Sequence, residues 1–229
     1  MEKKCIAIIT ARGGSKRIPK KNIKDFCGKP IIAYSIEAAI ESGLFDEVMV
    51  STDSEEIADV AREYGASVPF MRSEKTSDDY ATTNDVLREV ITEYKKRGKE
   101  YDIVVCMYPT APFITADKLK KAVALMDRDG VDGVTPVVRY SFPPQRAFVI
   151  RDDLLYYQFP ENKKKRSQDL EPIYHDCGQF YVMRSDDIFR SDNAAGSAPL
   201  IVSELEVQDI DNETDWKLAE MKYRLMKER

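Results

Sequence analysis

The chain has 229 residues, of which 43% are apolar and 33% charged, a balance typical of a globular protein that can bury a substantial core. With 35 basic against 40 acidic residues the formal net charge is −5, which argues against broad binding to nucleic acid or to an anionic membrane. The apolar run after the N-terminal Met-Glu-Lys-Lys is too short for a signal peptide or a membrane span, so we expect no membrane partner.

The cysteines are spread along the chain without a C-x-x-C pair; they are Cys5, Cys27, Cys106 and Cys177. Cys5 and Cys106 lie in apolar runs, where cysteine behaves as a small hydrophobic residue. We therefore expect reduced thiols and a cytoplasmic location.

Apolar runs alternate with segments of helical period from the N-terminus onward. In chain order we expect a strand at Cys5–Ile9, a helix at Pro30–Glu41, a strand at Val48–Ser51, helices at Ser54–Tyr64 and Thr83–Lys96, a strand at Asp102–Met107, a helix at Thr115–Met126 and a strand at Gly133–Val138. Strands that alternate with such helices form right-handed β-α-β units. We therefore predict the α/β class, with a mostly parallel sheet covered on both faces.

The alternation breaks between Tyr140 and Asp176, a stretch that holds four prolines and a cluster of aromatic residues. It is too apolar for a disordered linker, so we predict an inserted subdomain that packs on a second copy of the chain. The expected domains are a core of residues 1–139 and 177–229 and an insertion of residues 140–176. Regular structure should resume at Gln179–Met183, Ser185–Phe189, Glu206–Ile210 and in a final helix from about Glu213.

The loop after the first strand concentrates positive charge on an acidic protein. No acidic residue interrupts its cations, which are Arg12, Lys16, Arg17, Lys20, Lys21 and Lys24. Gly13 and Gly14 allow the backbone to approach an anion closely. We interpret the loop as a nucleotide polyphosphate site, with Ser15 as a hydroxyl donor; the alternative is a solvated surface loop. The sequence of this loop matches neither the P-loop motif nor G-x-G-x-x-G, so it does not support a P-loop hydrolase or a dinucleotide-dependent oxidoreductase.

A second feature is the segment Gln208-Asp209-Ile210-Asp211. On a strand, side chains two residues apart face the same side, so both carboxylates would point into one cleft. Two carboxylates suit Mg²⁺, which takes its other ligands from substrate phosphates and water. The alternative is that Asp211 and Asn212 cap the final helix.

Three further residues have two interpretations each. Asp53 either lies near the cleft or caps a helix, and Arg72 either approaches the nucleotide or is a surface arginine. The lone His175 is expected to be a structural or substrate-contact residue. No Ser-His-Asp or Cys-His set can be argued from the sequence.

Several motifs together resemble the acylneuraminate cytidylyltransferases, which make CMP-sialic acids. They are Ala11-Arg-Gly-Gly-Ser-Lys-Arg-Ile-Pro-Lys-Lys-Asn22, Gly28-Lys-Pro-Ile31, Ser51-Thr-Asp53, Arg72, Tyr108-Pro-Thr-Ala-Pro112 and Asp209-Ile-Asp211. Two further segments, Ser141–Phe148 and His175–Tyr181, look most like the pseudaminic acid members. The resemblance implies a three-layer αβα, Rossmann-like fold of the nucleotide-diphospho-sugar transferase type, with an insertion that forms a homodimer.

The resemblance also implies a role for each matching residue. CTP would be bound by Ala11, Arg12, Gly13, Ser15, Lys16, Lys21, Asn22, Arg72 and Thr83, with Arg72 and Thr83 on the cytidine half. Mg²⁺ would be held by Asp209 and Asp211, and the catalytic residues would be Asp211, Lys21 and Arg12. The sugar acid would contact Tyr108, Gln145, Arg146, Tyr174 and Gln179. The run Lys163–Arg166 would either reach the other subunit's sugar carboxylate or form a solvated turn.

One departure from the family pattern concerns the sugar. Sialic-acid enzymes carry glutamine where this chain has Tyr108, which favours a differently decorated nonulosonic acid. The expected reaction joins CTP to such an acid, most plausibly pseudaminic acid, and releases pyrophosphate. Legionaminate, neuraminate and ketodeoxyoctonate are alternative substrates. A non-catalytic nucleotide-binding module is the alternative of another class, although binding alone would not require paired aspartates.

Overall fold

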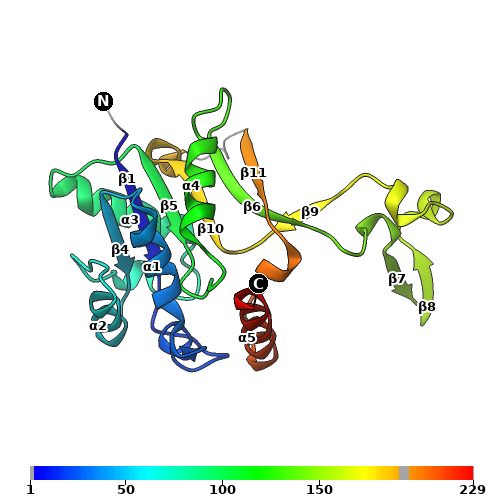
Figure 1. Cartoon of the computed structure of the whole chain (residues 1–229), viewed down its shortest axis with the longest axis horizontal. Helices are drawn as coiled ribbons and strands as arrows, with labels where there is room; N and C mark the ends of the chain where they lie inside the picture. Colours follow the sequence, from blue (N-terminus) through cyan, green and yellow to red (C-terminus); the bar gives the residue numbers. More distant parts are fainter. Residues whose placement is uncertain (1–2, 191–195, 229) are drawn as a thin grey trace.

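A seven-stranded mixed sheet forms the centre of the protein, whose computed structural model describes residues 3–190 and 196–228. The strand order is β11 (Ser197–Ile201), β6 (Gly133–Arg139), β10 (Phe180–Arg184), β5 (Ile103–Met107), β1 (Cys5–Thr10) and β4 (Glu47–Ser51), and β9 (Tyr174–Asp176) also pairs with β6 (Figure 1). β9 and β10 run antiparallel to their neighbours, whereas the other strands of the sheet share one direction.

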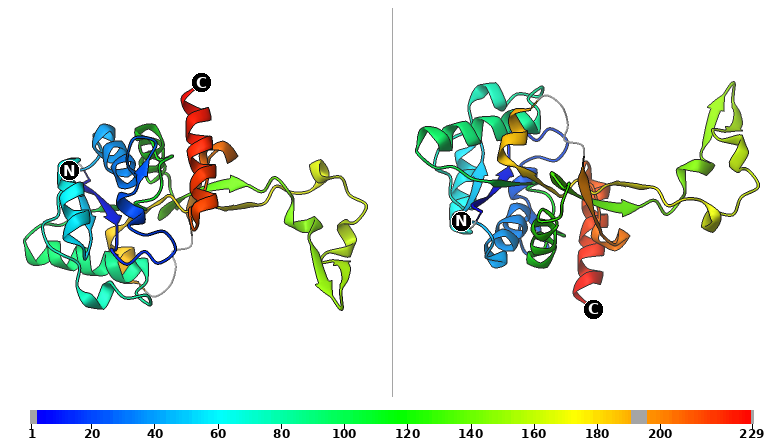
Figure 2. Two further views of the ribbon diagram at one scale, coloured as in Figure 1. Left: turned by 90° about the horizontal axis from the view of Figure 1, so that it is seen from below. Right: turned by 90° about the horizontal axis from the view of Figure 1, so that it is seen from above.

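Helices cover both faces of this sheet (Figure 2). One face packs against α1 (Ile31–Ser42), α2 (Glu55–Glu63) and α4 (Ala116–Leu125), and the other against α3 (Thr83–Lys96). Buried β1 residues alternate between the two cores, because successive strand side chains point to opposite faces. The predicted α/β fold with a mostly parallel, doubly covered sheet is confirmed.

Local capping explains why the helices begin where the sequence places them. The side chains of Ser54, Thr82 and Thr115 accept hydrogen bonds from backbone N–H groups in the first turns of α2, α3 and α4. These bonds satisfy donors that the helix itself leaves free. The predicted helix bounds therefore agree with the observed bounds to within two residues.

Two segments differ from the prediction. Glu206–Ile210 is not a strand: Glu204–Glu206 forms a 3₁₀ turn, and the chain is irregular from Val207 to the start of α5 (Glu213–Lys227). In addition, β11 was not expected from the sequence. Among the described strands it pairs only with β6, and it contains Pro199; such edge strands carry a weak sequence signal.

A third apolar cluster connects the two ends of the chain. Ile18 and Phe26, which follow β1, pack with Ile210 and with Trp216 of α5. This packing brings the basic loop of residues 11–24 beside the segment that carries Asp209 and Asp211.

Residues 140–173, which we call the arm, extend away from the sheet between β6 and β9 (Figures 1 and 2). The arm carries the hairpin of β7 (Phe148–Arg151) and β8 (Leu154–Tyr157). Tyr174–Asp176, the last residues of the expected insertion, form β9 in the main sheet. Large apolar side chains are exposed along the arm; they are Tyr140, Phe142, Phe148, Ile150, Leu154, Leu155, Tyr156, Phe159 and Ile173. Of the described helices, none has the length and apolar content needed to cross a bilayer.

Candidate functional site

A cavity of about 500 Å³ opens beyond the carboxyl ends of β1 and β5. This edge of a parallel sheet is where ligands of open α/β folds bind. Segments far apart in the sequence meet there. Of the predicted site residues, the cavity is lined by Arg12, Ser15, Lys16, Lys21, Asn22, Arg72, Thr83, Tyr108 and Asp211.

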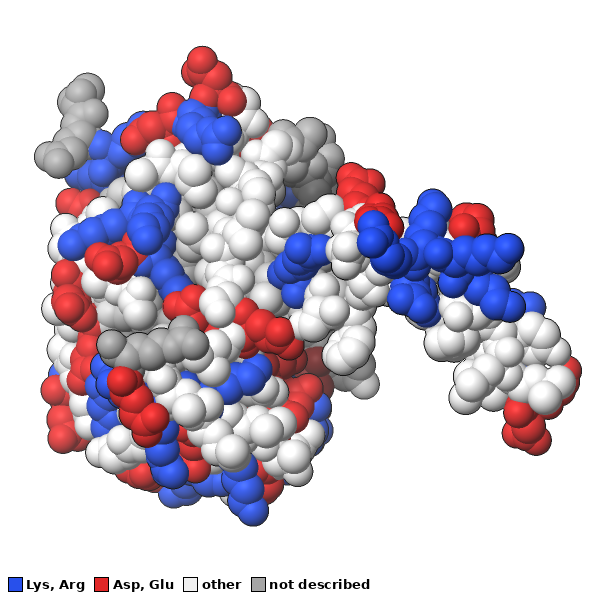
Figure 3. All heavy atoms as spheres, turned by 45° about the vertical axis from the view of Figure 1, so that its right-hand side comes forward, with Lys and Arg blue, Asp and Glu red and all other residues white. Residues whose placement is uncertain are grey.

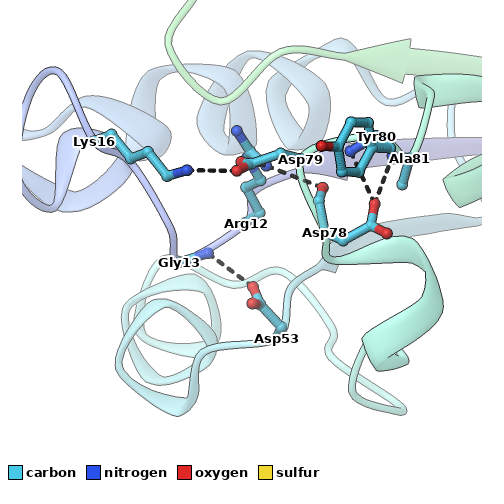
Figure 4. Close-up of polar contacts among 8 residues, drawn as sticks. All are labelled: Arg12, Gly13, Lys16, Asp53, Asp78, Asp79, Tyr80 and Ala81. Carbon is cyan, nitrogen blue, oxygen red and sulfur yellow. Dashed lines mark hydrogen bonds and ion pairs between the residues drawn. The ribbon is translucent and has the colours of Figure 1, made fainter.

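The basic loop is held in place by hydrogen bonds between its backbone and nearby side chains. The Gly13 N–H donates to Asp53 Oδ1 at 2.7 Å, and a Cβ at Gly13 would lie 3.1 Å from the Ser54 Cβ, so a side chain there would crowd α2 (Figure 4). Asn22 Nδ2 donates to the Arg12 carbonyl at 2.9 Å, and Ser15 Oγ to the Ile18 carbonyl at 2.6 Å. Ser54 and not Asp53 therefore caps α2, and Asp53 lies near the cavity, where it anchors the loop without lining the cavity itself.

Two cations of the loop are paired with an aspartate that sequence reasoning missed. Asp79 Oδ1 accepts from Arg12 Nη1 at 2.9 Å and Asp79 Oδ2 lies 2.5 Å from Lys16 Nζ (Figure 4). Hydrogen bonds from Lys16 and Arg12 lower the pKa of Asp79. Asp78 shapes this turn, since its carboxylate accepts hydrogen bonds from the N–H groups of Tyr80 and Ala81. We call residues 77–82 the acidic loop; its signal in the sequence is the pair Asp78-Asp79 between Arg72 and Thr83.

Arg72 is a cavity residue and not a surface arginine. Only 8% of it is exposed, and its guanidinium donates to Ser51 Oγ at 3.1 Å and to the Ser51 carbonyl at 2.7 Å. Burial lowers the pKa of Arg72, while the charges of Asp53 and Glu89 oppose that shift. Thr83, the first residue of α3, lines the same cavity.

Lys21 connects the basic loop to the C-terminal aspartates. Its Nζ donates to the Ile210 carbonyl at 2.6 Å, and the neighbouring Arg17 Nη2 lies 2.7 Å from Asp211 Oδ1. Burial lowers the pKa of Lys21, while the charges of Asp211 and Asp209 oppose the shift. The two charged motifs of the sequence therefore meet at one site.

Asp209 and Asp211 line two different hollows. On the strand that the sequence predicted, both would have faced the same side. Asp211 faces the cavity, whereas Asp209 lines an adjoining hollow of about 480 Å³. The irregular backbone of this segment explains the difference. The capping interpretation holds for Asn212, whose Oδ1 accepts from the Thr214 N–H at 2.8 Å at the start of α5.

The donor set agrees with a hard divalent ion that takes only part of its coordination shell from the protein. Within the described part of the chain no group of three or more His, Cys, Asp or Glu side chains forms a complete metal cage. Mg²⁺ usually binds one or two carboxylates together with substrate phosphates and water. Asp211 fits that role at the cavity, with Asp209 beside it.

The residues expected at the sugar are divided between the core and the arm. Tyr108 lines the cavity and packs edge-on against Tyr181, which with His175 lines the adjoining hollow. Gln179 is 2% exposed, and its Oε1 has no hydrogen-bond partner among the residues that the structure describes. Tyr174 is partly exposed on β9.

The other two sugar candidates, Gln145 and Arg146, lie on the arm. Their side chains donate to the Glu171 carbonyl at 2.7 Å and to Ser167 Oγ at 3.3 Å, which are contacts within the arm itself. Neither lines the cavity of its own copy. Ala11 is fully buried and extends the pairing of β1 with β4 through a bond from its N–H to the Ser51 carbonyl.

Comparison with known proteins gives consistent matches. The family model described as cytidylyltransferase matches residues 6–218. The chain is 42% identical to a pseudaminic acid cytidylyltransferase of Campylobacter jejuni subsp. jejuni serotype O:2, over 97% of both chains. It is 36% identical to a CMP-N,N'-diacetyllegionaminic acid synthase of Legionella pneumophila, again over 97% of both. A solved CMP:2-keto-3-deoxy-manno-octonic acid synthetase complexed with CTP has a TM-score of 0.69 at 19% identity, covers 99% of this chain and 100% of that one, and matches in fold.

Proposed function

This chain belongs to the cytidylyltransferase family, and from that premise we propose that it transfers CMP from CTP to the anomeric 2-hydroxyl of a nonulosonic acid. The contact of the basic loop with Ile210 and Asp211 around one cavity is the observation that best supports this reaction. We propose pseudaminic acid as the sugar, since the relative from Campylobacter jejuni is named for it. Tyr108 at the cavity agrees with a sugar other than N-acetylneuraminate.

The proposed roles follow the charge that develops in the reaction. Arg12, Lys16 and Lys21 bind the triphosphate and stabilise the negative charge that collects on the departing pyrophosphate. Arg72 and Thr83 contact the cytidine half at the other side of the cavity. Nucleotidyl transfer needs such positioning more than covalent help from the protein.

Asp211 is the carboxylate proposed to act closest to the reacting centre. The chemistry that Mg²⁺ supplies, when held by Asp211 with Asp209 beside it, is polarisation of the α-phosphate and a lower pKa for the attacking hydroxyl. The alternative role that we propose for Asp211 is to accept the hydroxyl proton directly.

The proposed function is tested with CTP, Mg²⁺ and a panel of pseudaminate, legionaminate, neuraminate and ketodeoxyoctonate. We expect pyrophosphate release and a CMP-sugar, detected by mass spectrometry, with the highest kcat/KM for pseudaminate. A faster reaction with another acid would reassign the substrate. Binding of CTP without pyrophosphate from any of the four would support a nucleotide-binding module instead.

We also propose that residues 140–176 dimerise a catalytic core of residues 1–139 and 177–229, and that the enzyme acts in the cytoplasm, where thiols stay reduced. The apolar side chains exposed on the arm support a dimer, since monomers rarely expose such patches. Basic side chains gather on the arm beside an uncharged surface (Figure 3), and Lys163–Arg166 are all exposed. In a dimer these cations, with Gln145 and Arg146, would reach the partner's sugar site.

The dimer predicts the result of a charge placed on the arm. Leu155, which is 67% exposed on β8, is expected to be covered in a dimer, so Leu155→Asp should give monomers in light scattering after gel filtration. Ile40→Asp, on the partly exposed side of α1, is the matched control and should leave the dimer intact. A wild-type protein that is monomeric at micromolar concentration would contradict the proposal.

Removing the negative charge of Asp79 from the acidic loop is expected to increase the affinity for CTP. Because Asp79 pairs with Arg12 and Lys16, it competes with the triphosphate for the same cations. Asp79→Asn should lower the KM for CTP about two- to fivefold, the range that exposed ion pairs support. The control Glu74→Gln removes one negative charge from the neighbouring turn and should leave KM unchanged. An unchanged or higher KM for Asp79→Asn would show that the aspartate does not compete.

A further inference from the structure

Residues 204–211, which we call the aspartate segment, carry both proposed metal ligands without belonging to the sheet. After the 3₁₀ turn the segment pairs with no strand among residues 3–190 and 196–228, so no ladder of backbone hydrogen bonds from these residues fixes it. A catalytic group nevertheless has to be held to within a fraction of an ångström. The structure must therefore fix this segment in another way.

Side chains from separate elements replace the missing ladder. Gln179 Nε2, at the start of β10, donates to the Glu206 carbonyl at 2.6 Å. Lys222 Nζ, on α5, donates to the Val207 carbonyl at 2.7 Å, and Lys21 Nζ donates to the Ile210 carbonyl at 2.6 Å. Backbone acceptors before and after Asp209 are thus bound by side-chain donors.

A partly buried ion pair holds the beginning of the segment. Lys118 of α4 is only 8% exposed, and its Nζ lies 2.9 Å from Glu206 Oε1 and donates to the Phe113 carbonyl at 2.9 Å. Burial raises the pKa of Glu206, but the hydrogen bond and charge of Lys118, together with a bond from the Ser203 N–H and the charge of Lys121, lower the pKa overall. Moving Glu206 away would leave the charge of the buried Lys118 uncompensated, which is costly in free energy. The pair therefore restrains the backbone that carries Glu206.

We propose that Lys118 and Lys222 are positioning residues, which hold the aspartate segment so that Asp211 meets the cavity in a productive geometry. Neither lysine lines the cavity, so each would act on Asp211 through the backbone that it holds; Lys222 also borders the adjoining hollow that Asp209 lines. The expected effect of these lysines on turnover rests on the function proposed above. The effect on the order of the segment is independent of that function.

Lys222→Met tests the proposal with little risk to folding, because Lys222 lies on a partly exposed side of α5. Hydrogen exchange of the unliganded protein should become faster in peptides covering residues 204–212 and remain unchanged in β1 and β5. kcat should fall about 10- to 100-fold, as for a misplacement of roughly 1 Å, with the KM for CTP within about twofold. The matched control is Lys217→Met on the exposed side of the same helix, which should change neither quantity.

Lys118→Met should give the same pattern, with Lys120→Met on the exposed side of α4 as its control. Because the loss of a buried cation can unfold the protein, Lys118→Arg is measured beside it and should restore kcat to within about threefold of wild type, since it keeps the pair with Glu206. Unchanged exchange in residues 204–212 of Lys222→Met would overturn the proposal, as would equal losses of kcat in Lys222→Met and Lys217→Met. If wild type releases no pyrophosphate with any sugar acid, the proposed function fails, while the exchange result still decides this inference.

Discussion

Asp211→Ala is expected to remove nearly all turnover and to leave the fold intact. The Asp211 carboxylate is the one of the C-terminal pair that lines the cavity, where it either holds Mg²⁺ or takes the hydroxyl proton. The fold should survive because α5 is capped by Asn212, and because Ile210 supplies the buried contact of this segment. The measurement is pyrophosphate release from CTP and the sugar acid at saturating Mg²⁺, with thermal unfolding in parallel.

Asp209→Ala is the matched control for this variant. Its carboxylate lines the adjoining hollow, so we expect a smaller loss of kcat and a higher requirement for Mg²⁺. Substantial Mg²⁺-dependent turnover by Asp211→Ala would show that the metal assignment is wrong. An equal loss in both variants would instead indicate that the two carboxylates act as one ligand pair.

The sequence was sufficient where local chemistry decides structure. Helical periodicity and capping side chains such as Ser54 and Thr82 place helices to within a residue or two, because the cap satisfies donors in the same turn. The cations of the basic loop and the carboxylate of Asp211 were recognisable by type. Their charge and glycine content predicted an anion site and a metal site without knowledge of the fold.

Contacts between distant segments could not be predicted in this way. Asp79 pairs with residues more than 60 positions earlier in the chain, and Lys118 pairs with Glu206 across almost 90. The periodicity of apolar residues along the sequence does not indicate such partners, since tertiary packing alone brings them together. The same limitation explains the aspartate segment, where alternating residues predicted a strand but side-chain donors took the place of a neighbouring strand.

Lys21→Ala is expected to lower kcat on the order of 10²-fold or more, as for the loss of a preorganised charge donor. Lys21 lies between the cavity and the aspartate segment, so its removal takes a positive charge from the leaving pyrophosphate and a donor from Ile210. The matched control is Lys20→Ala, because the ammonium of Lys20 pairs with Glu56 at 2.6 Å. A near-normal rate for Lys21→Ala would exclude its role at the phosphates.

The pKa of Lys21 offers a second test of the same role. Its ammonium is present below this pKa and is lost as the pH rises through it. Burial lowers the pKa, so kcat/KM, which reports the free enzyme, should begin to fall below the ordinary pH range of lysine. The charge of Asp209 opposes the shift, so Asp209→Asn should move the alkaline fall to still lower pH. An alkaline limb that stays in place in Asp209→Asn, or moves upward, would mean that a group other than Lys21 sets it.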